Sequence, residues 1–129
     1  MIAIMNKDLQ TLTRGEEEVM QIIWQLGEAS VAQIIENMEE PKPKYTTVAT
    51  FIKILENKGF VTHRAVGRGF CYYAVVAKEE YASGMAKSLL ASYFNGSLSQ
   101  MVSFFGKKED ISVVEMDEIL EIVEQIKGK

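Results

Sequence analysis

Cysteine and histidine are nearly absent from this chain of 129 residues, which contains one of each, Cys71 and His63. A single cysteine excludes an internal disulfide, and together with a single histidine it leaves no Cys/His metal cage. The sequence also has no nucleophile elbow, no phosphate-binding glycine loop and no histidine placed as a base beside a nucleophile. We therefore expect no enzyme activity, no cofactor and no metal site.

Long hydrophobic runs are missing as well. No stretch approaches the roughly 18 apolar residues of a membrane span. The apolar opening MIAIM is too short for a signal peptide and has no basic residue before it. Hydrophobic residues still make up 47% of the chain, enough for a core of ordinary size. These features predict a soluble globular protein in the cytoplasm.

The net charge of −4 disfavours a nucleic-acid partner, but the charges are unevenly distributed. Residues 41–70 contain six lysines and arginines and one glutamate, a local net charge of +5. Residues 77–129 contain six lysines and nine acidic residues, a local net charge of −3. A polyanion responds to the local field, so the basic middle of the chain remains a candidate binding surface.

Helical periodicity predicts three helices in the first half of the chain, over residues 13–27, 30–38 and 46–58. The first begins with a capping box, Thr13 and Glu16, and the second repeats that spacing. Both prolines of the chain lie in EEPKPK, which predicts a loop before the third helix. The expected buried face of the third helix consists of Val48, Phe51, Ile52 and Leu55.

After the third helix the pattern changes to strand-like alternation. FVTHRAV and FCYYAVV are rich in β-branched and aromatic residues and flank GRG, a hairpin turn signal. Three helices followed by a β-hairpin is the order of a winged helix-turn-helix. The predicted fold class is therefore mostly α with a small β-hairpin, a winged-helix DNA-binding domain over residues 1–76 followed by a helical domain over 77–129.

The start of the third helix carries an unusual number of hydrogen-bonding side chains. Threonine can donate, accept or contact a thymine methyl group in the major groove, and lysines and helix N-termini suit phosphates. One threonine is also expected to cap the helix. With Lys42 guiding the approach, the predicted contacts with DNA are Lys44, Tyr45, Thr46, Thr47, Ala49, Thr50 and Lys53, together with Arg68 between the two hairpin glycines.

The C-terminal helices carry more apolar surface than a small winged-helix domain can cover. They could fold back to form a single core, but a second copy of the chain suits a two-fold DNA site better, so we expect a homodimer. The residues expected at the dimer interface are Tyr81, Met85, Leu89, Met116, Leu120 and Val123.

Three segments resemble the penicillinase-repressor family of bacterial transcriptional repressors: LTRGEEEVMQIIWQLGEASVAQIIENM, YTTVATFIKILENKGFV and GRGFCYYAVVAKEEY. The resemblance extends over almost the whole chain from about Leu12. It implies a DNA-binding winged helix, a helical dimerisation domain, and a dimer that represses transcription from an inverted-repeat operator.

The resemblance also implies a means of induction. In antibiotic-responsive members a membrane sensor peptidase triggers proteolysis of the repressor after an asparagine in an Asn-Phe pair. The corresponding residues here are Phe104 and Phe105, so the asparagine is replaced. Copper-responsive members carry a C-terminal Cys-x-Cys metal site, which this chain lacks because no cysteine follows Cys71.

Two alternatives to a repressor relieved by proteolysis remain open. The winged helix could be a protein-interaction module, which the acidic total charge favours. The chain could also be a repressor controlled by a small molecule, with an aromatic pocket between its domains lined by residues such as Tyr72, Tyr81 or Tyr93.

Overall fold

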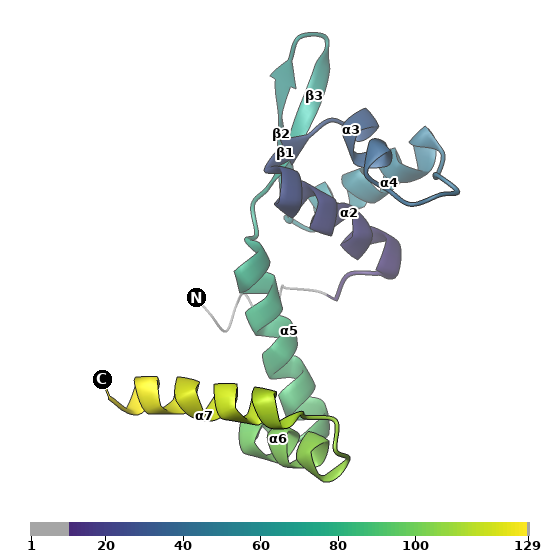
Figure 1. The fold of residues 1–129 in the computed structure, drawn as a ribbon. Coiled ribbons are helices and arrows are strands. Elements are labelled where there is room, and N and C mark those ends of the chain that lie inside the picture. Colours follow the sequence, from purple (N-terminus) through teal and green to yellow (C-terminus); the bar gives the residue numbers. More distant parts are fainter. Residues whose placement is uncertain (1–10, 129) are drawn as a thin grey trace. The chain divides into compact units, whose positions relative to one another are not determined.

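A computed structural model describes residues 11–128. The chain divides into two compact units, of which the first ends at Met85 and the second begins at Ala86. Within the described residues, no helix is both long and apolar enough to cross a membrane. The elements of the two units are labelled in Figure 1.

The first unit opens with two helices that begin as their sequences predict. Helix α2 (Arg14–Leu26) starts with the complete Thr13–Glu16 capping box, and Gly27 ends it with a φ of 89°. Helix α3 (Val31–Glu36) starts with the complete Ser30–Gln33 box. Each box satisfies two backbone N–H groups that the first turn of a helix leaves free, so local sequence is enough to start these helices.

Helix α4 (Tyr45–Asn57) follows the proline-containing loop and leads into the hairpin of β2 (Val61–Val66) and β3 (Gly69–Ala74). The hairpin pairs antiparallel from Val61 opposite Ala74 to Val66 opposite Gly69. A third, two-residue strand, β1 (Glu28–Ala29), pairs with β3, giving the sheet order β1-β3-β2. The predicted fold class is confirmed, while β1 was not predicted.

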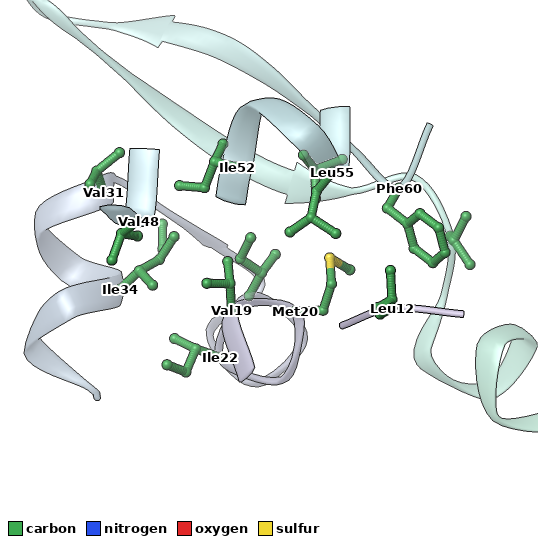
Figure 2. Close-up of a cluster of buried hydrophobic side chains, with 14 of the residues drawn as sticks. Leu12, Val19, Met20, Ile22, Val31, Ile34, Val48, Ile52, Leu55 and Phe60 are labelled. Atoms are coloured by element: carbon green, nitrogen blue, oxygen red, sulfur yellow. The ribbon is translucent and has the colours of Figure 1, made fainter. Parts of the chain in front are cut away.

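The core of this unit lies between its three helices and the base of the sheet. Figure 2 shows side chains from α2, α3 and α4 converging there, with Phe60 at one end. Val48, Ile52 and Leu55 are buried as expected from their helical spacing, and Phe51 is half-buried. One face of α4 is therefore held firmly by the core, and the opposite face is free for other contacts.

Helix α5 (Lys78–Tyr93) contributes its first turns to the same core. Tyr81 is only 5% exposed; its ring contacts Trp24 and Phe60, and its hydroxyl accepts a hydrogen bond from the Leu12 N–H at 3.1 Å. Met85 packs against this cluster. The expectation that Tyr81 forms part of a dimer interface is therefore wrong, because its side chain completes the core of its own unit. The first unit accordingly extends past residue 76, where we had placed its end.

The second unit contains the rest of α5, α6 (Leu98–Lys107) and α7 (Val113–Lys127). Ser97 and Ser112 cap α6 and α7 by accepting hydrogen bonds from backbone N–H groups. Neither helix has a buried residue, and large apolar side chains along α7 are exposed, among them Val113, Leu120 and Ile126. The single protomer thus leaves the apolar face of this unit in contact with water.

Candidate nucleic-acid interface

Close packing between α2 and α4 positions the candidate interface. A Cβ atom added to Gly15 would lie 2.5 Å from the Phe51 ring, nearer than real side-chain contacts allow. Gly15 thus lets the first turn of α2 approach α4 directly. Val48, Ile52 and Leu55 anchor α4 in the same core, so its exposed face has a defined orientation.

The N-terminus of α4 differs from those of α2, α3, α6 and α7, which all have a serine or threonine cap. Its N-cap is Lys44, whose side chain makes no capping hydrogen bond, and the helix begins at Tyr45. The prediction that Thr46 or Thr47 caps the helix is therefore wrong. The free N–H groups and the positive end of the helix dipole remain available to an anion such as a DNA phosphate.

The exposed face of α4 presents the side chains that the sequence pattern indicated. Tyr45, Thr46, Thr47, Thr50 and Lys53 are exposed, and Ala49 is half-buried. The Thr50 hydroxyl donates a hydrogen bond to the Thr46 carbonyl at 2.8 Å. The Thr50 hydroxyl proton is thus already used, although its oxygen can still accept a hydrogen bond. The hydroxyl of Thr47 has no such partner among the described residues.

Ion pairs within the first unit reduce the basic surface that the sequence suggests. Arg64 binds Glu28 through several hydrogen bonds, the shortest 2.7 Å, and this bonding lowers the pKa of Glu28. Lys58 binds Glu16 at 2.8 Å. Burial raises the pKa of Glu16, but hydrogen bonds from Lys58 and Thr13 and the Lys58 charge outweigh burial and bring it below its ordinary value.

Lys42 is also engaged within the unit. Its ammonium group donates to the carbonyl groups of Ile35, Glu36 and Met38 at the end of α3. Lys42 therefore satisfies the free carbonyl groups at the C-terminus of α3. These contacts account for the position of its side chain without a contact with DNA.

Of the six basic side chains in residues 41–70, three remain after these contacts are set aside. Lys44, Lys53 and Arg68 are exposed, and none forms a salt bridge with another residue of the described chain. They are the three cations predicted to contact phosphates. The structure therefore separates the basic residues of 41–70 into a set engaged within the unit and an unpaired set at the start of α4, more than two turns along α4, and at the hairpin tip.

Arg68 lies in the turn that joins β2 to β3, beyond their last paired residues, Val66 and Gly69. Figure 1 shows this hairpin projecting from the helices α2, α3 and α4. Gly67 has a φ of 60°, and Arg68 has no positive φ, which is the pattern of a type II′ turn. Glycine at the first turn position avoids the strain of that backbone conformation. A helix with an uncapped N-terminus and a glycine-flanked arginine on a wing suits the groove and backbone of double-stranded DNA.

One contact in this region involves residues that the sequence pattern did not single out as a pair. The His63 Nδ1 atom lies 2.6 Å from a carboxylate oxygen of Glu56, which joins β2 to the last turn of α4. These residues are seven positions apart on different elements, so no helical or strand period indicates the contact.

The residues predicted for dimerisation and cleavage lie in the second unit, apart from Tyr81 and Met85. Leu89, Met116, Leu120 and Val123 are exposed. Phe104 and Phe105 are exposed within α6, and their rings contact each other edge to face.

The fold and these side chains define a winged-helix DNA-binding protein. A family model described as "Penicillinase repressor" matches residues 12–125, and the chain belongs to this penicillinase-repressor family. This match confirms the resemblance noted in the sequence. Members of the family are transcriptional repressors and not enzymes, as expected for this chain.

Individual relatives extend over nearly the whole chain. A penicillinase repressor of Bacillus licheniformis is 28% identical over 95% of this chain and 97% of its own length. The methicillin resistance regulatory protein MecI of Staphylococcus aureus (strain N315) is 31% identical over 92% of this chain and 98% of its own length. Among solved structures, the DNA-binding domain of the repressor BlaI is 25% identical, with a TM-score of 0.49, over 55% of this chain and 88% of that one.

Proposed function

We propose that this chain is a homodimeric, sequence-specific repressor that binds an inverted-repeat operator in the bacterial cytoplasm. The first unit of each protomer reads one half-site, and the second unit joins the two protomers. The observation that carries this proposal is the free, threonine-rich start of α4 together with the three unpaired cations Lys44, Lys53 and Arg68.

In this proposal, base edges and phosphates are contacted by different parts of the first unit. Thr46, Thr47, Ala49 and Thr50 face the major groove, where hydroxyl and methyl groups distinguish base pairs. Tyr45, Lys44 and Lys53 lie beside them at the backbone, and Arg68 reaches a neighbouring phosphate or the minor groove from the wing. Phosphate contacts supply affinity, and the threonines supply discrimination between sequences.

The second unit supports self-association through its apolar surface. Leu89 is exposed on α5, and Met116, Leu120 and Val123 are exposed on α7, which buries no residue within the protomer. An apolar surface of this kind is costly in water and marks an interaction site. A second copy is the partner that also explains a two-fold operator.

Proteolysis within the second unit is the proposed means of induction. The bond between Phe104 and Phe105 lies inside α6, so a protease must first unfold part of that helix. A membrane sensor peptidase, or a protease under its control, is the proposed partner. Separating the protomers would forfeit the avidity of two linked half-site contacts, about 10²- to 10⁴-fold.

A mobility-shift assay at physiological salt tests the proposal. The probe is the duplex upstream of the chain's own gene, and a scrambled duplex of the same composition is the competitor. We expect a complex that resists the scrambled competitor. Arg68→Ala should weaken binding to both duplexes alike and lower the salt-dependence slope by roughly one unit per protomer. Equal affinity for the two duplexes would contradict sequence-specific repression.

A further inference from the structure

The wing is attached to the rest of the first unit mainly at its base. All residues from His63 to Phe70 are exposed, and β1 pairs with β3 only at Tyr72 and Tyr73. Among the described residues, no third strand flanks the distal half of the hairpin, which is joined to the rest of the unit through side chains, Arg64 to Glu28 and His63 to Glu56. A two-stranded ribbon of this kind bends easily about its base.

His63 makes the contact that joins this distal half to α4. Its Nδ1 atom lies 2.6 Å from Glu56 Oε2, while its ring meets Phe70 edge to face with centroids 4.9 Å apart and Tyr72 with centroids 5.6 Å apart. The register places His63 opposite Tyr72 and Ala65 opposite Phe70, so all these side chains share the face of the sheet turned toward α4. The imidazole therefore connects the helix to both strands of the wing.

The two ends of this connection are both near proposed DNA contacts. Glu56 follows Lys53 by one helical turn on α4, and Phe70 follows Arg68 by two residues at the hairpin tip. Neither His63 nor Glu56 has to touch DNA. Fixing the angle between the helix and the wing lets Thr47 and Arg68 meet the duplex together, because a wing already in place loses less entropy on binding.

We propose that His63 and Glu56 are positioning residues, a clasp that orients the wing so that Arg68 contacts the operator while α4 lies in the major groove. This inference rests on the proposed function, because it assigns the geometry with which the same interface binds. The clasp acts through Arg68, so removing it matters only while Arg68 is present.

A charge-matched pair of variants separates positioning from general electrostatics. Glu56→Gln and Glu28→Gln each remove one negative charge from the first unit, and each replaces a partly exposed carboxylate that contacts a side chain of β2. Electrostatics alone predicts that both variants bind DNA more tightly. The clasp predicts that Glu56→Gln weakens operator binding about five- to twentyfold, since the loss occurs in both protomers, whereas Glu28→Gln does not weaken it.

A double-mutant cycle tests the connection to Arg68. His63→Ala should weaken operator binding by about as much as Glu56→Gln does. It should also lower the salt-dependence slope as Arg68→Ala does, because both variants lose the same phosphate contact. The double variant His63→Ala, Arg68→Ala should bind no more weakly than Arg68→Ala alone. Thermal melts of every variant at one protomer concentration establish that each is folded.

The outcomes keep the clasp and the proposed function apart. If the unaltered protein does not prefer operator over scrambled duplex, the proposed function fails before any variant is compared. If it does, and Glu56→Gln binds as tightly as Glu28→Gln, the clasp is wrong. Losses from His63→Ala and Arg68→Ala that multiply in the double variant would also overturn it, because His63 would then act independently of Arg68.

Discussion

The threonines of α4 share an exposed face but differ in what their hydroxyl groups can do. The Thr50 hydroxyl already donates to the Thr46 carbonyl, whereas the Thr47 hydroxyl has no partner among the described residues. Position in the helix made these residues equivalent in the sequence, and one hydrogen bond separates them in the structure. The free Thr47 hydroxyl can donate to a base edge, whereas the Thr50 side chain can only accept or make an apolar contact through its methyl group.

We predict that Thr47→Val changes discrimination between operators with single base substitutions by about 1–3 kcal/mol. Thr50→Val should change it by less than about 0.5 kcal/mol, because the methyl surface is kept. Competition binding against a panel of substituted operators measures both values. Thr47→Ser is the control, since it keeps the hydroxyl and should retain the original preference; an equal effect of the two valine variants would contradict the assignment.

The Glu16–Lys58 pair provides a prediction about stability and pH. The Glu16 side chain is almost fully buried, so Lys58→Met leaves a carboxylate without its cation. At pH 7 we expect the free energy of unfolding to fall by about 1.5–3 kcal/mol. The exposed Lys53, changed to methionine, is the control for the loss of one charge. Urea denaturation at a fixed protomer concentration provides the measurement.

The sign of the pH effect follows from the lowered pKa of Glu16, whose ordinary value is 4.5. A carboxyl with a lowered folded-state pKa stabilises the protein above its unfolded-state pKa, and that contribution is lost as the pH falls through the folded-state value. The deficit of Lys58→Met should therefore be full at pH 7 and shrink as the pH falls below 4.5 and through the lowered folded-state pKa of Glu16. A deficit that does not shrink as the pH is lowered through the acid transition of the carboxyl groups would contradict this account.

Among the secondary-structure elements, α2 and α4 pack closely against each other where Gly15 meets the Phe51 ring. We predict that Gly15→Ala destabilises the protein by about 1–3 kcal/mol, because the new methyl group would overlap the Phe51 ring. Helix propensity alone predicts the opposite, a gain of about 1 kcal/mol. In a Phe51→Leu background, Gly15→Ala should cost much less stability, because the smaller leucine side chain leaves room for the new methyl group. Thermal unfolding of the unaltered protein, the two single variants and the double variant measures this coupling. Additive losses of stability would show that the two residues do not meet.

The elements differ in how well local sequence predicts them. Capping boxes placed the starts of α2 and α3 correctly, because both members of each box lie within four residues. The threonine cap expected for α4 is wrong, since Lys44 occupies that position. Strand β1 was missed because two residues carry no period, and its pairing with β3 joins Glu28 to Tyr73.

For the molecule as a whole, the exposed apolar face of the second unit is the proposed dimer interface. Leu120 is 62% exposed in the protomer. We predict that Leu120→Asp shifts the protein to monomers and raises the operator Kd by about 10²- to 10⁴-fold, with no effect on a single half-site. Gln125→Asp adds the same charge to α7 without removing an apolar side chain, and it should remain dimeric. Sedimentation equilibrium and binding assays measure both; a Leu120→Asp dimer of normal affinity would contradict the proposed interface.

Local pattern was sufficient for the helices, the hairpin, the buried face of α4 and the residues on its opposite face, because helical and strand periods repeat over a few residues. The roles of the basic residues could not be read in this way. Lys58 pairs with Glu16 across 42 positions and Arg64 with Glu28 across 36, so the chain's folding leaves Lys44, Lys53 and Arg68 unpaired. Tyr81 likewise belongs to the core because Leu12, 69 positions earlier, reaches its hydroxyl. Such contacts depend on which distant elements pack together, and no local period encodes that choice.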